Sequence, residues 1–346
     1  MCNVAGFIGG QKAAPVLLDM LSRLEGYAGG YHTGICTLHE GKLHLRKVEG
    51  SVADLLKMTD AAELPGNIGI AHTRPDMGGG VTHSHPFLSH DERLAYIVNG
   101  HVGYYQSAGL DPSTLAAEVL AKGGDFSTRF TCHCEPGACT HPQLSDGMQI
   151  HFTDLSCQLL AQAIEHEASI PTGIATAMSQ CPSEIVGLML HQASPGQIQV
   201  MRFNQPLTVA QHNGEMYLAT TTLGLDIAQA QWQMVFPVSS FGFVERDRVS
   251  CQPLAIKDKQ CCQKLPWTAA YEIISKRLKD ADGAGIQDLK DATGGLWPKE
   301  FAPQKDFLVY AILQSMQSEG KIRQENFTRI GKHSGKAAAH TRFFLV

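Results

Sequence analysis

The chain has 346 residues, and its 28 basic and 33 acidic side chains give a formal net charge of −5 at pH 7. This charge excludes a general electrostatic attraction to nucleic acid or to an anionic membrane surface. No apolar run approaches the roughly 20 residues that a membrane-spanning helix needs. The N-terminus also lacks the basic segment and apolar stretch of a secretory signal. We therefore expect a cytoplasmic protein that does not bind membranes.

Strand-like and helix-like segments alternate in the first half of the chain. NVAGFIGG predicts a buried strand entering a turn, and residues 14–24 place apolar side chains at helical spacing. ICTL and KLHLRKV predict a hairpin, and NIGIAHTR predicts another strand. LAYIVNGHVGYY predicts a strand that Asn99 and Gly100 interrupt. Further helices are predicted for residues 51–58, 115–121 and 154–164.

The second half of the chain begins with a two-residue alternation over residues 184–222, which predicts antiparallel hairpins. Together with the helices it indicates a layered α+β architecture. We predict a linker at residues 241–265, where the pattern loosens. Residues 266–346 predict three helices and two closing strands, the layout of a winged helix. Acidic and basic residues are interleaved there, so we expect protein contacts or dimerisation rather than nucleic-acid binding.

Cys2 is the first candidate for chemistry. Removal of Met1, which is normal when the second residue is small, would expose Cys2 as the N-terminal residue. Its thiol can then attack a carbonyl carbon while its own α-amine, with a reference pKa of about 7.7–8.0, carries the proton. A small buried cysteine is the competing interpretation. The motifs that accompany Cys2 decide between the two.

Four separated motifs, MCNVAGFIG, GIAHTRPD, THSHPF and YIVNGHVGYY, resemble those of class II glutamine amidotransferases in order and approximate spacing. They are most similar to the glutaminase half of glutamine–fructose-6-phosphate amidotransferase. RLEGYAGGYHTGICTL, FTDLSCQLLAQAI and the strand-rich segment up to Leu225 extend the resemblance. It implies a four-layer αββα N-terminal nucleophile hydrolase domain over residues 2–240.

The resemblance also implies roles for individual residues. Cys2 would be the nucleophile, and the Asn99 side-chain amide and the Gly100 N–H would form the oxyanion hole. Arg74 would clamp the α-carboxylate of glutamine, because guanidinium and carboxylate groups pair through two parallel hydrogen bonds. His85 would lie beside the glutamine pocket.

Asp154 would hold the α-ammonium group of the same substrate, again by resemblance. A helix N-cap is the alternative for this residue, since aspartate is favoured there for backbone reasons. For Asn99 and Gly100 the alternative is a tight hairpin turn. His85 would otherwise be an ordinary packed or surface histidine.

The sequence departs from the family's pattern around the expected pocket. Asn3 stands where the family usually has glycine, and Gly29 stands where it has arginine. His32 replaces an acidic residue. After Arg74, the residues Pro75-Asp76-Met77-Gly78 replace Trp-Ala-Thr-His. These changes leave the nucleophile, the oxyanion donors and the carboxylate clamp intact, but they bear on the strictness for glutamine.

An insertion at residues 128–150 has no counterpart in the resemblance. It contains Cys132, Cys134, Cys139 and His141, and four thiolate or imidazole ligands within ten residues could hold a structural zinc ion. Their spacing is not one of the standard pairs, and a flexible cysteine-rich loop is the competing view. No cofactor other than this zinc is expected.

The resemblance implies a glutaminase that hydrolyses glutamine to glutamate and ammonia through a Cys2 thioester. Residues after 240 do not resemble the sugar-isomerase module of the synthase, so we expect ammonia to pass to a separate synthase subunit. One alternative is a stand-alone amidohydrolase acting on another γ-glutamyl amide. Another is an inactive protein that senses glutamine and signals through the winged helix.

Overall fold

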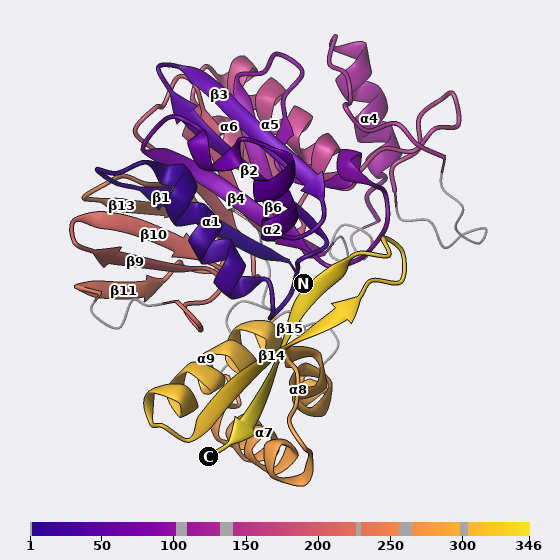
Figure 1. Cartoon of the computed structure of the whole chain (residues 1–346). Coiled ribbons are helices and arrows are strands. Elements are labelled where there is room, and N and C mark those ends of the chain that lie inside the picture. Colours follow the sequence, from indigo (N-terminus) through magenta and orange to yellow (C-terminus); the bar gives the residue numbers. More distant parts are fainter. Residues whose placement is uncertain (1, 102–108, 132–140, 226–229, 256–264, 298–303) are drawn as a thin grey trace.

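The computed structural model describes residues 2–101, 109–131, 141–225, 230–255, 265–297 and 304–346. Two antiparallel sheets, a two-stranded ribbon and several helices make up this part of the chain (Figure 1). The seven-stranded sheet has the order β11 (Trp232–Val235), β9 (Thr208–His212), β10 (Glu215–Ala219), β1 (Asn3–Ile8), β4 (Ile68–Arg74), β2 (His32–His39) and β3 (Lys42–Glu49). The six-stranded sheet has the order β13 (Val249–Pro253), β12 (Ser240–Val244), β8 (Ile198–Arg202), β7 (Glu184–His191), β6 (Leu94–His101) and β5 (Phe87–Leu88). The ribbon pairs β14 (Ile322–Ile330) with β15 (Ala337–Leu345).

Helices lie on the outer faces of the two sheets (Figure 1). α1 and α2 pack on the seven-stranded sheet, and α5 and α6 pack on the six-stranded sheet. The α-helices described are α1 (Ala13–Leu24), α2 (Val52–Met58), α4 (Pro112–Ala121), α5 (Phe152–Glu167), α6 (Ile170–Gln180), α7 (Trp267–Asp280), α8 (Ile286–Thr293) and α9 (Gln304–Ser318). Short 3-10 helices are η1 (Ala61–Glu63), η2 (Val81–His83) and η4 (Gly294–Leu296). None of the described helices is both long and apolar enough to cross a bilayer.

Side-chain alternation along β1 explains how the sheets are covered on both faces. Ala5 and Phe7 pack in the cluster that contains α1, whereas Val4 and Ile8 pack in the cluster between the two sheets. Such a two-residue period is what a strand with two buried faces requires. Gly6 lies where the sheets approach closely, because a Cβ there would come within 3.3 Å of Leu188 and Ile198 side chains. The mixed helix and sheet prediction is confirmed.

Two predicted local features differ from the structure, and one helix was not predicted. β6 continues through Asn99 and Gly100, which pair with Val186 and Ile185 of β7, so the expected interruption is wrong. The predicted linker contains β12 and β13, which extend the six-stranded sheet as far as Pro253. The five residues SFGFV are nearly all buried, so this strand carries no two-residue alternation that the sequence could reveal. α6 had no predicted counterpart.

The C-terminal region, residues 265–346, consists of α7, α8, α9 and the β14–β15 ribbon. Its helices share a hydrophobic cluster with α1, and the ribbon reaches the loop that follows α1 (Figure 1). Phe343 of β15 stacks on Tyr27, with ring centroids 5.8 Å apart. The Thr341 N–H donates to the Gly26 carbonyl at 2.8 Å. The C-terminal region therefore packs directly against the first sheet and its helix.

Phe343→Ala tests this packing. The side chain is fully buried, and its removal should lower the free energy of unfolding by about 3–5 kcal/mol, because a large cavity forms. Phe327→Ala is the matched control on the neighbouring strand β14, since that ring is 39% exposed. Urea unfolding followed by circular dichroism measures both. Equal effects of the two substitutions would contradict the packing described here.

Candidate active site

Side chains alternate between the two faces of a strand. Along β1, β4 and β6, this alternation places the predicted site residues at one end of the space between the sheets. On β4, Ile68 and Ile70 face the other sheet, and the same face continues to His72 and Arg74. On β6, Ala95 and Ile97 face inward, and this face continues to Asn99. Asn3 pairs with Thr73, so Cys2 comes opposite Arg74. Residues far apart in sequence thus meet through strand register alone.

Cys2 and Asn99 are joined by a direct hydrogen bond. The Cys2 backbone N–H donates to Asn99 Oδ1 at 3.0 Å. Asn99 is 1% exposed, and its Nδ2 group has no hydrogen-bond partner among the described residues. An amide donor left free in a buried position beside a thiol is suited to bind an oxyanion. The prediction that Cys2 and Asn99 lie together agrees with this geometry.

The Cys2 thiol has an unusual electrostatic environment. Desolvation raises its pKa, and the Arg74 guanidinium opposes the rise only in part. The thiol is therefore protonated near neutral pH, and a base is needed before it can attack a carbonyl carbon.

Gly100 has a steric reason to be glycine. A Cβ at this position would lie 2.5 Å from the Glu184 carbonyl oxygen and 2.7 Å from the Ile185 Cα of β7. The pair Asn99-Gly100 is therefore not a turn but a place where two strands approach closely. The role of the Gly100 N–H as an oxyanion donor stays a prediction.

Arg74 is buried at the end of β4, with 6% of its surface exposed. Its Nη1 donates to the His83 carbonyl at 2.8 Å, and this bond orients the guanidinium group. Burial lowers the pKa of Arg74, while Cys2 and Asp76 act to raise it. A buried guanidinium with one described hydrogen bond retains donors for a carboxylate.

Histidines surround Arg74 in a cluster that sequence reasoning largely missed. His85 is 4% exposed and contacts the His72 ring at 2.9 Å, and its Nε2 atom has no partner in the parts of the chain that the structure describes. His72 Nε2 lies 3.0 Å from the Val98 carbonyl. His151 lies between these rings and His141, with centroid distances of 5.7 Å to His85 and 6.1 Å to His141. The position of His72, two residues before Arg74 on one strand face, was the available signal.

The histidines of the cluster are neutral at pH 7. Burial, followed by the charge of Arg74, lowers the pKa of His72 to about 3 and those of His32 and His83 to about 4. The pKa of His85 is also well below its ordinary value, through burial and then His72. These rings can therefore donate and accept hydrogen bonds without adding positive charge beside the clamp.

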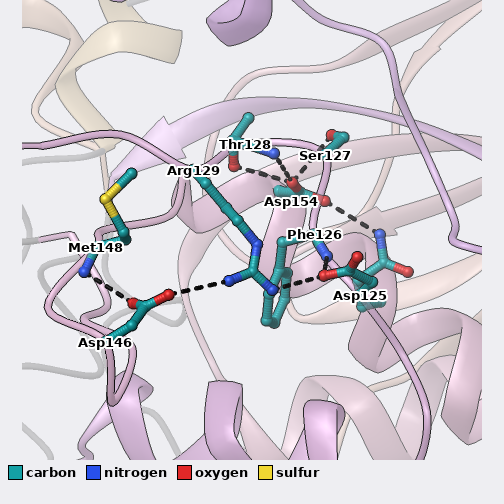
Figure 2. Close-up of polar contacts among 9 residues, drawn as sticks. Asp125, Phe126, Ser127, Thr128, Arg129, Asp146, Met148 and Asp154 are labelled. Carbon is teal, nitrogen blue, oxygen red and sulfur yellow. Dashed lines mark hydrogen bonds and ion pairs between the residues drawn. The ribbon is translucent and has the colours of Figure 1, made fainter.

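Asp154 is engaged within the protein (Figure 2). Its Oδ2 accepts hydrogen bonds from Ser127 Oγ at 3.0 Å and from the Thr128 N–H at 2.8 Å. Its Oδ1 accepts one from Gln158 Nε2 at 3.1 Å. The N-cap alternative is wrong, because His151 caps α5 by accepting from the Thr153 N–H. Asp154 thus anchors the start of the insertion, and its contact with a substrate ammonium stays a prediction.

The loop after α1 is held by Asn3 and lies against the C-terminal ribbon. Asn3 Nδ2 donates to the Leu24 and Ala28 carbonyls, both at 2.7 Å, and so holds the loop after α1. Gly30 in this loop has φ +84°, and a Cβ there would lie 2.7 Å from the Ala338 Cβ of β15. An added side chain would collide with the ribbon. Gly30 therefore makes room for the C-terminal region, whereas a Cβ at Gly29 would lie 2.5 Å from the Thr73 side chain of β4.

Asp76 connects the loop after Arg74 to the turn between β14 and β15. Its carboxylate accepts from the His333 N–H at 2.6 Å and from the Ser334 N–H at 2.9 Å. Burial acts to raise its pKa, but these hydrogen bonds outweigh burial and lower it. Such charge-assisted bonds are among the stronger polar contacts. No sequence signal linked Asp76 to a turn about 257 residues away.

The predicted zinc site lies mostly outside the described residues. Cys132, Cys134 and Cys139 lie outside the described residues. His141 lies against Phe130, with ring centroids 5.0 Å apart. In the portion of the chain with described coordinates, no group of histidine, cysteine or acidic side chains is arranged to hold a metal ion. The zinc site stays a prediction.

Comparison with curated proteins finds relatives named glutamine–fructose-6-phosphate aminotransferase (isomerizing). The protein from Pyrococcus horikoshii is 26% identical over 277 residues, covering 78% of this chain and 40% of the relative. The one from Agrobacterium fabrum is 27% identical over 227 residues, covering 65% and 32%. The one from Caldanaerobacter subterraneus is 38% identical over 107 residues, covering 30% and 17%. The chain thus spans at most 40% of the length of these relatives. No family model matches it.

Solved structures show the same fold. Glutamine phosphoribosylpyrophosphate amidotransferase from B. subtilis, complexed with ADP and GMP, superposes with a TM-score of 0.57 at 16% identity, covering 74% of this chain and 50% of that one. A structure described as the allosteric regulatory enzyme of purine biosynthesis gives 0.55 at 15% identity, with the same coverage. In its sequence relatives and its antiparallel two-sheet fold, the chain is similar to the class II glutamine amidotransferases.

Proposed function

We propose that the protein hydrolyses glutamine to glutamate and ammonia, with Cys2 as its N-terminal nucleophile after removal of Met1. The observation that carries this proposal is the hydrogen bond from the Cys2 N–H to Asn99 Oδ1, beside an unpartnered Asn99 Nδ2. Arg74, opposite Cys2 on the neighbouring strand, supplies a buried cation for the substrate α-carboxylate. Nucleophile, oxyanion donor and carboxylate clamp then lie at one end of the two sheets.

The reaction has two acyl-transfer steps. Cys2 Sγ attacks the side-chain carbonyl carbon of glutamine as the thiol proton passes to the Cys2 α-amine. The tetrahedral oxyanion accepts hydrogen bonds from Asn99 Nδ2 and the Gly100 N–H. The α-amine returns the proton to the departing nitrogen, so ammonia leaves and a γ-glutamyl thioester remains. Water then attacks the thioester, its proton passes through the α-amine to sulfur, and glutamate is released.

The ammonia is proposed to pass to a separate synthase subunit. The curated relatives are named for both glutamine and fructose 6-phosphate, and this chain spans at most 40% of their length. The sheets with their outer helices support assignment to the four-layer αββα hydrolases. Three helices followed by a ribbon support a winged-helix assignment for the C-terminal region, which is suited to protein contacts.

A second candidate is hydrolysis of another γ-glutamyl amide. The observation in its favour is that both Asp154 carboxylate oxygens already accept hydrogen bonds within the protein. The ammonium contact expected for free glutamine would have to compete with these bonds. Ammonia release from a panel of γ-glutamyl amides and glutamine separates the two candidates. Efficient turnover of glutamine alone would rule the second one out.

Cys2→Ala should abolish glutaminase activity, and Asn99→Ala should lower kcat by about 10²–10³, because one oxyanion donor is lost. Coupled detection of glutamate measures both variants. Cys251→Ala is the matched control, since that cysteine is exposed on β13 and should leave activity unchanged. Full activity of the Cys2→Ala variant would disprove the mechanism.

The pH profile should identify the base. The α-amine must be unprotonated to accept the thiol proton, so kcat/KM should fall as pH drops through the amine pKa, for which the reference is about 7.7–8.0. The pKa of His83 is about 4, so this ring stays neutral across that range. His83→Gln should leave the midpoint of the acidic limb unchanged. A shift of that midpoint in the variant would show that a histidine is the base.

Asp76→Ala should raise KM for glutamine about tenfold while kcat changes little, because the loop after Arg74 loses its anchor on the ribbon. Steady-state kinetics separates the two parameters. Asp60→Ala is the control, since this exposed carboxylate pairs with Arg46 elsewhere on the surface. An unchanged KM in Asp76→Ala, or an equal rise in the control, would contradict the anchoring role.

A further inference from the structure

A cavity of about 640 Å³ lies where the C-terminal region meets the first sheet. The loop of residues 26–31 and Pro75 form one wall. The start of α8 and the β14–β15 ribbon form the other. Small-molecule sites typically have volumes of about 300–1,000 Å³ and often lie at domain junctions. The cavity is therefore of the size that a small metabolite occupies.

The charged groups of this cavity are mostly basic. Arg329, Arg342 and Lys290 line it, together with one acidic side chain, Asp288. Asp288 Oδ2 accepts a hydrogen bond from the Gly285 N–H, which partly satisfies its charge. Lys290 is committed to Asp306, with Nζ and Oδ1 2.7 Å apart and both side chains 9% exposed. The two arginines remain as the groups that can meet a ligand.

Neither arginine has a described carboxylate partner. Glu325 stands directly across the ribbon from Arg342, but it is paired with Arg323. The Arg342 guanidinium lies over the Phe327 ring instead, 4.8 Å from the centroid. A cavity lined by two guanidinium groups without described acidic partners can bind a dianion. Guanidinium groups pair with phosphate oxygens through two parallel hydrogen bonds.

The same cavity has an aromatic wall. Phe327 is 39% exposed although it is a large apolar ring. It lies 5.7 Å from His340, whose Nε2 is 3.0 Å from the Tyr31 hydroxyl. Burial, and then Arg329, lowers the pKa of His340, so that ring is uncharged at pH 7. A flat apolar surface next to two guanidinium groups suits a ligand with a ring and an anionic end.

We propose that this cavity binds a small phosphate monoester that carries a ring. The site is separate from Cys2, but its wall is attached to the glutamine clamp. The Tyr31 N–H donates to the Arg74 carbonyl at 3.2 Å, and the Gly30 N–H donates to Thr73 Oγ1 at 2.7 Å. Pro75, another wall residue, directly follows Arg74. Occupancy of the cavity therefore alters the loops that hold Arg74, and with them the affinity for glutamine.

Binding is tested by titration calorimetry of the full chain without glutamine, so the result does not depend on glutaminase activity. The probes are phenyl phosphate, ribose 5-phosphate, inorganic phosphate and phenol. The variants are Arg329→Gln and Arg342→Gln. Lys332→Gln is the matched control, because it removes a charge from the same ribbon outside the cavity lining. Equal melting temperatures of the four proteins establish that all are folded.

We expect millimolar or tighter binding of at least one of the two monoesters, weakened about tenfold or more by each arginine substitution and unchanged by Lys332→Gln. The monoester that binds more tightly shows whether the site prefers an aromatic ring or a sugar ring. Inorganic phosphate and phenol should each bind more weakly than that monoester. No binding of either monoester, binding that the arginine substitutions leave unchanged, or phenol binding as strong as phenyl phosphate would overturn the proposal.

Discussion

The site depends on the hydrogen bond between the Cys2 N–H and Asn99 Oδ1, because this contact joins the end of one sheet to the end of the other. It forms only where the two sheets come close together. Gly6 allows that approach on β1, and Gly100 allows β6 to run against the backbone of β7. The same close packing buries Asn99 to 1% exposure, and its Nδ2 group finds no partner in the described part of the chain. The close packing of the two sheets therefore also accounts for the free amide donor of the proposed oxyanion hole.

The sequence predicted the strands and helices whose apolar residues recur with a clear period. It predicted Cys2 as nucleophile and Arg74 as carboxylate clamp through the resemblance to a family. Sequence patterns failed where tertiary pairing overrides a local signal. Asn99-Gly100 has the composition of a turn, yet pairing with β7 keeps it extended. β12 and β13 have weak alternation of their own and are strands because β8 pairs with β12. Asp154 accepts hydrogen bonds from residues 26 and 27 positions away, which no local pattern could indicate.

The histidine cluster and the Asp76 contacts were also beyond sequence reasoning. His72, His85 and His151 come from separate segments and meet only after the sheets pair. Their burial beside Arg74 keeps them neutral, so they add no positive charge next to the guanidinium of the proposed clamp. Asp76 bonds to backbone N–H groups of a turn in the C-terminal region. Backbone partners leave no trace in the amino-acid sequence.

One departure from the family's pattern, Asp76, has an explanation in the C-terminal region. Asp76 sits where the ribbon's turn crosses the loop after Arg74, and Gly30 sits where the ribbon crosses the loop after α1. Both loops border the proposed glutamine pocket. Contacts with the C-terminal region of the same chain therefore lie next to Arg74, the proposed carboxylate clamp.

Intact-mass analysis after treatment with diazo-oxo-norleucine, a γ-glutamyl electrophile, tests the central claim most directly. The account predicts a protein that lacks Met1 and carries one covalent adduct, which peptide mapping assigns to the N-terminal Cys2. The adduct should be absent when excess glutamine protects the site. Retention of Met1, or an adduct on a different cysteine with Cys2 unmodified, would contradict the account.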